Sequence, residues 1–241
     1  NWAGFFLPKQ TYLKCSALYD FCRVVDNIAD SNETIEIKKI KFLDFQQNFN
    51  NHKFDDPIIK NMWQLINEFN IPLKVVHDLL DGINSDIQKN IKLNKKKDLL
   101  LYSYRVAGTV GLMMAKILRV NKKSSLKSAI DLGIAMQLTN ISRDVVEDLN
   151  FGRSYINLNF EEIRSTIELS ENYYRNSFYS IKEIPFTFRF AILVARRVYR
   201  KIGYKILRKQ NLEDYRKSGK IYVSNIEKII ETLLSIFDLI K

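Results

Sequence analysis

The chain has 241 residues, of which 46% are hydrophobic, and its 38 Lys and Arg exceed 27 Asp and Glu for a formal net charge of +11. This composition excludes a disordered chain, and no apolar run is long enough for a membrane-spanning helix. The positive charge is typical of three classes of partner: nucleic acid, an anionic membrane surface, or a small acidic substrate. We expect no nucleic-acid partner, because the basic runs are scattered and no zinc-finger or RNA-recognition motif accompanies them.

Helical periodicity dominates the chain, and only 8 Gly and 4 Pro interrupt it. Strand and hairpin signals are nearly absent, and no Pro/Gly/Ser-rich linker divides the sequence. We therefore predict one all-α domain over residues 1–241. The predicted helices are, in chain order, Gln10–Asp30, Thr34–Asn48, Pro57–Phe69, Leu73–Ile87, Lys97–Leu118, Ser125–Leu149, Phe160–Ile181, Phe186–Gln210 and Ser224–Ile240.

The N-terminal region bears on where the protein resides. It lacks the charged segment and long apolar core of a signal peptide, and it opens without Met inside an apolar segment, so we expect the natural start to lie upstream. Cys15 and Cys22 are seven residues apart on one predicted helix, too far for a disulfide, which favours reduced thiols. We predict a cytoplasmic protein, with peripheral contact to the inner membrane face as an extension. No pattern indicates an oligomeric state.

Two pairs of aspartates share one spacing on two of the predicted helices. Asp26 and Asp30 are four residues apart, and Asp144 and Asp148 repeat that spacing. Each pair therefore presents two carboxylates on one helical face. Two such faces turned toward each other would hold Mg²⁺, which prefers hard oxygen ligands, and through it a diphosphate. The alternative is four solvated surface charges, but two pairs, each beside an arginine, favour a metal–diphosphate site.

The second aspartate helix carries a longer polar stripe. Its members follow at offsets of three, four and four: Gln137, Asn140, Asp144 and Asp148. Two amides and two carboxylates are a poor core face, but they suit the wall of a polar pocket. The carboxylates and the Asn140 carbonyl would ligate metal, while Gln137 would orient water or diphosphate oxygens. Arg143 could add a charge-assisted contact to phosphate.

The first aspartate helix repeats this pattern at offsets of four, three and four. Its stripe consists of Tyr19, Arg23, Asp26 and Asp30. The alternative for the first two residues is an ordinary Tyr/Arg packing pair. Residues 152–155 follow the second aspartate helix as a predicted loop, which would bring a flexible cation, Arg153, and a phenol, Tyr155, to the rim of the pocket.

Small residues gather in the middle of one predicted helix, at Ala107–Gly111. A mid-helix Gly costs up to about 1 kcal/mol relative to Ala, so these positions need a reason. They could widen an apolar tunnel for a long, thin chain, they could allow close helix packing, or they could mark a kink. Gly133, on the second aspartate helix, could likewise widen an apolar tunnel or allow close helix packing.

Three segments together resemble the squalene and phytoene synthase family of head-to-head prenyl synthases. They are Ala17–Asp30, Val106–Met113 and Asp131–Tyr155, with the small-residue helix between the two aspartate helices. The runs QLTNISRD at 137–144 and KIYVS at 220–224 are most similar to the bacterial phytoene synthase branch. The resemblance extends over almost the whole chain.

The resemblance implies an all-α isoprenoid synthase bundle around a central cavity and a prenyltransferase activity. The implied reaction condenses two geranylgeranyl diphosphates head to head, through a cyclopropyl (prephytoene) diphosphate, to phytoene in carotenoid biosynthesis. Mg²⁺ would be the cofactor, with Mn²⁺ as a substitute, and NADPH is not expected. One alternative is a squalene or dehydrosqualene synthase that uses farnesyl diphosphate. Another is a non-catalytic family member that acts as an assembly or scaffold protein, although such a protein could lose the carboxylates that are intact here.

The resemblance also assigns roles to single residues. The metal ligands would be Asp26, Asp30, Asn140, Asp144 and Asp148. Diphosphate would be bound by Arg23, Arg143 and Lys220, and the reacting centre would be lined by Tyr19, Tyr102, Gln137 and Tyr155. The faces of Tyr102 and Tyr104 could stabilise a carbocation. Two features depart from the family: Lys220 stands where Arg is usual, which gives a point charge without bidentate geometry, and the family's Ser-rich segment would fall before Asn1.

Overall fold

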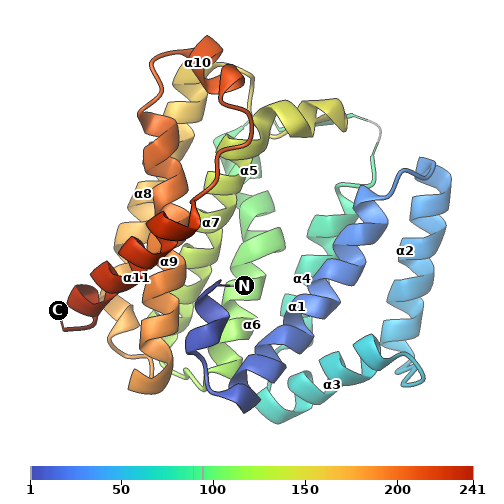
Figure 1. The fold of residues 1–241 in the computed structure, drawn as a ribbon. Helices are drawn as coiled ribbons and strands as arrows, with labels where there is room; N and C mark the ends of the chain where they lie inside the picture. Colours follow the sequence, from blue (N-terminus) through green and yellow to red (C-terminus); the bar gives the residue numbers. More distant parts are fainter. Residues whose placement is uncertain (1, 89, 94, 241) are drawn as a thin grey trace.

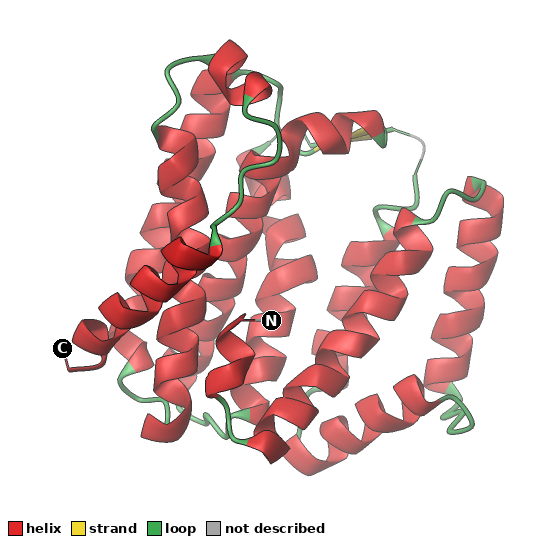
Figure 2. Ribbon diagram, in the orientation of Figure 1, coloured by secondary structure: helices red, strands yellow, loops and turns green. Residues whose placement is uncertain are grey.

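The computed structural model describes residues 2–88, 90–93 and 95–240, and these form an almost entirely helical bundle (Figures 1 and 2). Two strands of two residues each, β1 (Ile91–Lys92) and β2 (Arg153–Ser154), pair in parallel. The helices are η1 (Trp2–Phe6), α1 (Lys9–Asp30), α2 (Ile35–Asn50), α3 (Pro57–Phe69), α4 (Leu73–Asn84), α5 (Lys96–Ser103), η2 (Tyr104–Gly108), α6 (Thr109–Ile117), α7 (Lys123–Asn150), α8 (Phe160–Ile181), α9 (Phe186–Leu207), α10 (Leu212–Lys217) and α11 (Asn225–Ile240). The all-α prediction is confirmed.

Helix ends follow local signals that the sequence shows. The helix α3 begins at Pro57, where the missing N–H costs nothing, and the Asp56 side chain accepts a hydrogen bond from the Ile58 N–H. It ends at Asn70, which adopts the left-handed conformation with φ of 49°. Thr34 caps α2 in the same way, through the Ile37 N–H. Such signals explain why the predicted bounds of α3 and α8 match the structure at both ends.

Several elements differ from the prediction, and the helices α4 and α9 each end three residues before their predicted ends, at Asn84 and Leu207. The single helix expected over 97–118 is divided by the π-helical turn η2 between α5 and α6. A π turn adds one residue to a turn, so it shifts the faces of the helix without interrupting it. The short helices η1 and α10 were not predicted. For α10 the decisive feature is local, because the Asn211 side chain accepts a hydrogen bond from the Asp214 N–H at 2.9 Å.

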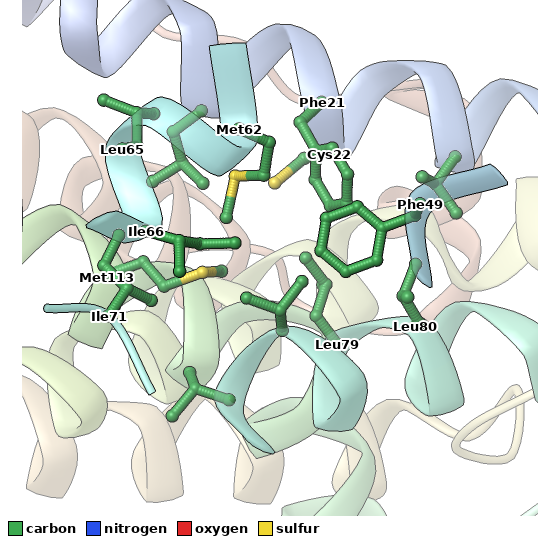
Figure 3. Close-up of a cluster of buried hydrophobic side chains, with 14 of the residues drawn as sticks. Phe21, Cys22, Phe49, Met62, Leu65, Ile66, Ile71, Leu79, Leu80 and Met113 are labelled. Atoms are coloured by element: carbon green, nitrogen blue, oxygen red, sulfur yellow. The ribbon is translucent and has the colours of Figure 1, made fainter. Parts of the chain in front are cut away.

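Two hydrophobic clusters form the core. The first lies among α1, α2, α3, α4 and α6, and Figure 3 shows part of it, with Phe21, Phe49, Met62, Leu79 and Met113 packed together. The second joins α5, α7, α8, α9 and α10. Both aspartate helices, α1 and α7, bury their apolar faces in these clusters. Their polar stripes are thereby left free to face a cavity.

The small residues serve close packing of α6 and η2 against α7. A Cβ added at Gly111 would lie 2.2 Å from the Ala129 carbonyl oxygen, and one added at Gly133 would lie 2.3 Å from the Ala107 carbonyl oxygen. A Cβ at Gly108 would meet the side chains of Ile130 and Tyr104 at 3.1 Å. The tunnel explanation for these glycines is therefore wrong, and the close-packing explanation is right.

The last helix, α11, lies across α9 (Figure 1) and turns its polar face inward. Glu231 and Ser235 are buried, and Arg197 of α9 contacts Glu231 at 3.1 Å and Asp238 at 2.6 Å. The outward face is apolar and consists of Ile226, Ile229, Ile230, Leu233, Leu234, Ile236, Phe237 and Ile240. Within the described residues, no helix is both long enough and apolar enough to cross a membrane.

Candidate functional site

A cavity of about 180 Å³ brings both aspartate pairs together at one end of the bundle. Asp26 and Asp30 enter it from α1, and Asp144 and Asp148 enter it from α7. The remaining lining residues come from the same two helices, from the α4–β1 loop, from α5 and η2, and from β2 and the residue after it. They are Ala29, Asp86, Tyr102, Val106, Gln137, Asn140, Ile141, Arg153 and Tyr155.

Burial and neighbouring negative charge raise the pKa of two aspartates in this cavity, Asp26 and Asp148. Burial, followed by the charges of Asp30 and Asp86, raises the pKa of Asp26 to about 7, although its side chain opens onto the cavity. Burial and the charge of Asp144 raise the pKa of Asp148 to about 7 as well. A site that disfavours its own negative charge in this way is poised to bind cations.

Asp86 is the fifth carboxylate of the cavity, and it holds a pair of tyrosines. The Tyr102 hydroxyl donates to Asp86 Oδ2 at 2.7 Å, and the Tyr155 hydroxyl donates to Asp86 Oδ1 at 2.7 Å. The two rings stack with centroids 4.5 Å apart. Burial raises the pKa of Asp86 and of both phenols, so the tyrosines stay protonated. Asp86 therefore fixes two aromatic rings in the wall of the cavity.

Arg153 lies at the rim, but its side chain is held in place and only 12% exposed. Its Nη1 contacts Asp30 Oδ1 at 2.7 Å, and its Nη2 donates to the Ala29 carbonyl oxygen at 3.1 Å. The flexible cation expected from the sequence is thus an ordered bridge between the ends of α1 and α7.

The amides on α7 complete the polar wall. The Asn140 Nδ2 lies 3.5 Å from Gln137 Oε1, while the Asn140 Oδ1 is buried without a hydrogen-bond partner. A buried oxygen without a partner is costly unless a ligand satisfies it. No three acidic, His or Cys side chains among the described residues are close enough to form a ready-made metal cage. Mg²⁺ does not require one, because it usually keeps waters and shares its shell with substrate phosphates.

Two further cations lie beside the cavity and pair with Asp144. Arg143 Nε donates to Asp144 Oδ1 at 2.8 Å and its Nη2 to Oδ2 at 2.5 Å, and Lys220 Nζ lies 3.4 Å from Asp144 Oδ1. Lys220 also pairs with Glu147. The buried Tyr215 of α10 donates from its hydroxyl to the carbonyl oxygens of Ser142 and Arg143, both at 2.9 Å. This contact attaches the segment that carries Lys220 to α7.

Besides Arg143 and Lys220, three more of the sequence candidates lie outside the cavity lining. Tyr19 is 55% exposed and Arg23 is also exposed, although both belong to the same α1 stripe as Asp26 and Asp30. Tyr19 and Arg143 both act electrostatically on Tyr199 of α9, so these three side chains lie near one another. Tyr104 donates its hydroxyl to Asp78 Oδ2 on α4 at 3.0 Å, away from the carboxylates. Tyr104 is therefore not among the residues that line this cavity.

The comparison with known proteins identifies the family. Residues 1–159 match the family model described as squalene/phytoene synthase. The chain belongs to this family. Members of the squalene/phytoene synthase family are prenyltransferases, so the resemblance noted in the sequence is confirmed. The 15-cis-phytoene synthase of Enterobacter agglomerans is 31% identical over 222 residues, which cover 79% of this chain and 75% of that protein. The phytoene synthase of Cereibacter sphaeroides is 29% identical over 239 residues, covering 86% and 67%.

Solved structures of the squalene/phytoene synthase family share the fold. A dehydrosqualene synthase in complex with ligand superposes with a TM-score of 0.77 at 29% identity, over 98% of this chain and 90% of that one. A squalene synthase from Alicyclobacillus acidocaldarius superposes with a TM-score of 0.73 at 17% identity, over 89% and 88%. The all-α isoprenoid synthase bundle expected from the sequence is confirmed.

The sequence did not indicate Asp86. It predicted Arg153 at the rim of the pocket but not its ion pair with Asp30. Asp86 stands alone in the turn after α4, in no repeated spacing, so nothing separates it from a surface aspartate. The two aspartate pairs were recognisable because spacing and helical periodicity combine. A carboxylate on a loop acquires its role only through the fold.

Proposed function

We propose that this protein is a phytoene synthase, which condenses two geranylgeranyl diphosphates head to head to phytoene. The observation that carries the proposal is the convergence of both aspartate pairs on one cavity. The names of the relatives at about 30% identity support the C20 substrate. A scaffold protein would have no need to keep five carboxylates in a single cavity.

The residues of the cavity fit a divalent metal. Asp26, Asp30, Asp144 and Asp148 supply hard oxygen donors from two walls, and the partnerless Asn140 Oδ1 offers another. We propose that these five residues hold Mg²⁺ or Mn²⁺. When bound, the metal neutralises the diphosphate as it leaves.

The protein's own side chains bind and shield the reacting groups in this proposal. Arg143 and Lys220 contact diphosphate oxygens, Lys220 as a point charge. The stacked Tyr102 and Tyr155 face the cavity and stabilise positive charge on the allylic carbon after the first diphosphate departs. The double bond of the second substrate attacks that carbon and a proton is lost, which gives the cyclopropyl diphosphate. Loss of the second diphosphate, rearrangement and loss of another proton give phytoene.

Purified protein incubated with radiolabelled geranylgeranyl diphosphate, with and without Mg²⁺, tests the proposal. We expect phytoene as the product, strict dependence on Mg²⁺ or Mn²⁺, and no stimulation by NADPH. Product formed in the presence of a chelator would contradict the metal assignment. No turnover with any prenyl diphosphate would favour the scaffold alternative.

A second candidate is a dehydrosqualene or squalene synthase that acts on farnesyl diphosphate. The structural likeness to a dehydrosqualene synthase, over 98% of this chain, favours it. The same assay with farnesyl diphosphate separates the two. A higher kcat/KM with the C15 substrate would replace the phytoene synthase proposal, and NADPH-dependent squalene would identify a reductive enzyme.

We also propose a peripheral contact with an anionic membrane face. The net charge of +11 attracts anionic headgroups, and the proposed substrates and product are long apolar molecules. This contact would be electrostatic and reversible.

A further inference from the structure

Arg153 has a backbone that the fold holds in place. It lies in β2, where it pairs in register with Ile91 of β1. The Ile91 N–H donates to the Gly152 carbonyl oxygen and the Leu93 N–H to the Ser154 carbonyl oxygen, both at 3.1 Å. The guanidinium therefore starts from a fixed point on the loop that follows α7.

From that point Arg153 reaches the end of the other aspartate helix. Besides its ion pair with Asp30, it donates a hydrogen bond to the carbonyl oxygen of Ala29, in the last turn of α1. The last carbonyl groups of a helix have no partner within the helix, and the helix dipole favours a cation there. Arg153 thus closes α1 onto α7 through two contacts that span 123 and 124 residues of sequence.

Arg153 also offsets part of the negative charge of the cavity. The cavity lining contains five aspartates, and Arg153 is its one cationic side chain within the described residues. Its positive charge also acts on Asp26, Asp86 and Asp148. Arg143 and Lys220 pair with Asp144 of α7, and neither is among the residues that line the cavity. Without Arg153, no cationic side chain among the described residues would line the cavity between the carboxylates of α1 and those of α7.

We infer that Arg153 is a tethered counter-cation of the carboxylate cavity: it ties Asp30 to the loop after α7 when no divalent cation is bound, and it yields Asp30 when one binds. The exchange follows because Arg153 and a metal compete for the same carboxylate oxygen. This inference rests on the proposed metal site.

Thermal unfolding at low ionic strength tests the first part of the inference, that Arg153 stabilises the metal-free protein. We expect Arg153→Gln without metal to melt about 2–4 °C or more below the wild type. Mg²⁺ should then raise the melting temperature of the variant more than that of the wild type, so that the two converge. The matched control is Arg175→Gln, which removes an exposed α8 arginine whose contacts stay within its own helix. That control should melt like the wild type under both conditions.

Calorimetric titration with Mg²⁺ alone tests the exchange. Arg153→Gln should bind Mg²⁺ several-fold more tightly, because no cation has to leave Asp30. Arg153→Lys keeps the charge but cannot bridge both Asp30 and the Ala29 carbonyl oxygen, so its Mg²⁺ affinity should lie between those of the wild type and Arg153→Gln. If the Gln variant does not fold, the Lys variant provides the test.

Equal metal-free melting of Arg153→Gln and wild type, or weaker Mg²⁺ binding by Arg153→Gln, would overturn the inference while leaving the metal site intact. A wild-type protein that does not respond to Mg²⁺ would overturn the proposed metal site and the exchange with it.

Discussion

The proposed metal site can be tested at single carboxylates, because Asp→Asn is an isosteric change. Asp26→Asn and Asp144→Asn each remove one negative oxygen without changing the side-chain volume. We expect each to lower turnover by about 10²–10³-fold, the usual effect of losing one group that stabilises developing charge. Helical circular dichroism should stay close to the wild type. Asp20→Asn, an exposed change on the same helix α1, is the matched control. Near-normal rates in either cavity variant would refute the metal assignment.

The raised pKa values of Asp26 and Asp148 make the metal-free protein sensitive to pH. Both carboxyls titrate near 7 when folded but near 3.9 when unfolded. The folded state therefore binds more protons between about pH 4 and pH 7, and these groups lower the stability as the pH rises through that window. We expect the metal-free protein to gain stability on going from pH 8 to pH 5.5 relative to Asp26→Asn.

Metal binding should reverse that dependence, because Mg²⁺ requires the ionised carboxylates. Titration calorimetry in two buffers of different ionisation enthalpy would measure the protons released on Mg²⁺ binding near pH 7. If no protons were released, the raised pKa values would not belong to the groups that bind the metal.

At the scale of elements, the contact between α6 and α7 depends on glycines that meet backbone. Gly111→Ala and Gly133→Ala would each place a methyl group against a carbonyl oxygen, which cannot move as a side chain end can. We expect losses of about 1–3 kcal/mol in the free energy of unfolding, measured with urea. Gly203→Ala is the control, because its Cβ would meet only the Ile167 side chain, at 3.2 Å. Activity on C15 and C20 diphosphates should fall together, and a selective loss of C20 activity would restore the tunnel explanation.

The elements also show what the sequence alone could predict. Periodicity, with Pro57 and the caps Asp56 and Thr34, placed the ends of α2 and α3 to within two residues. The π turn at Tyr104–Gly108 could not be predicted, because it is only five residues long and lies within an otherwise continuous helical pattern. Its position depends instead on close approach, since a Cβ at Gly82 of α4 would lie 2.8 Å from the Arg105 Cβ.

The site, too, combines features that the sequence predicts with features that depend on the fold. Asp26, Asp30, Asp144 and Asp148 were recognisable because each pair has a spacing that puts both carboxylates on one helical face. That the two faces meet depends on how the helices pack. The partner of Arg153 lies 123 residues away, and this contact depends on the parallel pairing of β1 with β2, four residues in all. Such short strands leave no periodic pattern in a sequence.

At the scale of the whole molecule, the excess of positive charge predicts binding to anionic membranes. Liposome flotation with anionic and neutral vesicles at about 0.1 M and about 1 M salt would measure it, since the screening length falls from about 10 Å to about 3 Å over that range. We expect binding to anionic vesicles at low salt, loss of binding at high salt, and none to neutral vesicles. Binding to neutral vesicles that resists salt would contradict the electrostatic account and point to an apolar contact, for which the exposed apolar face of α11 is a candidate. Absence of binding to any vesicle would leave the net charge of +11 to serve the diphosphate substrates alone.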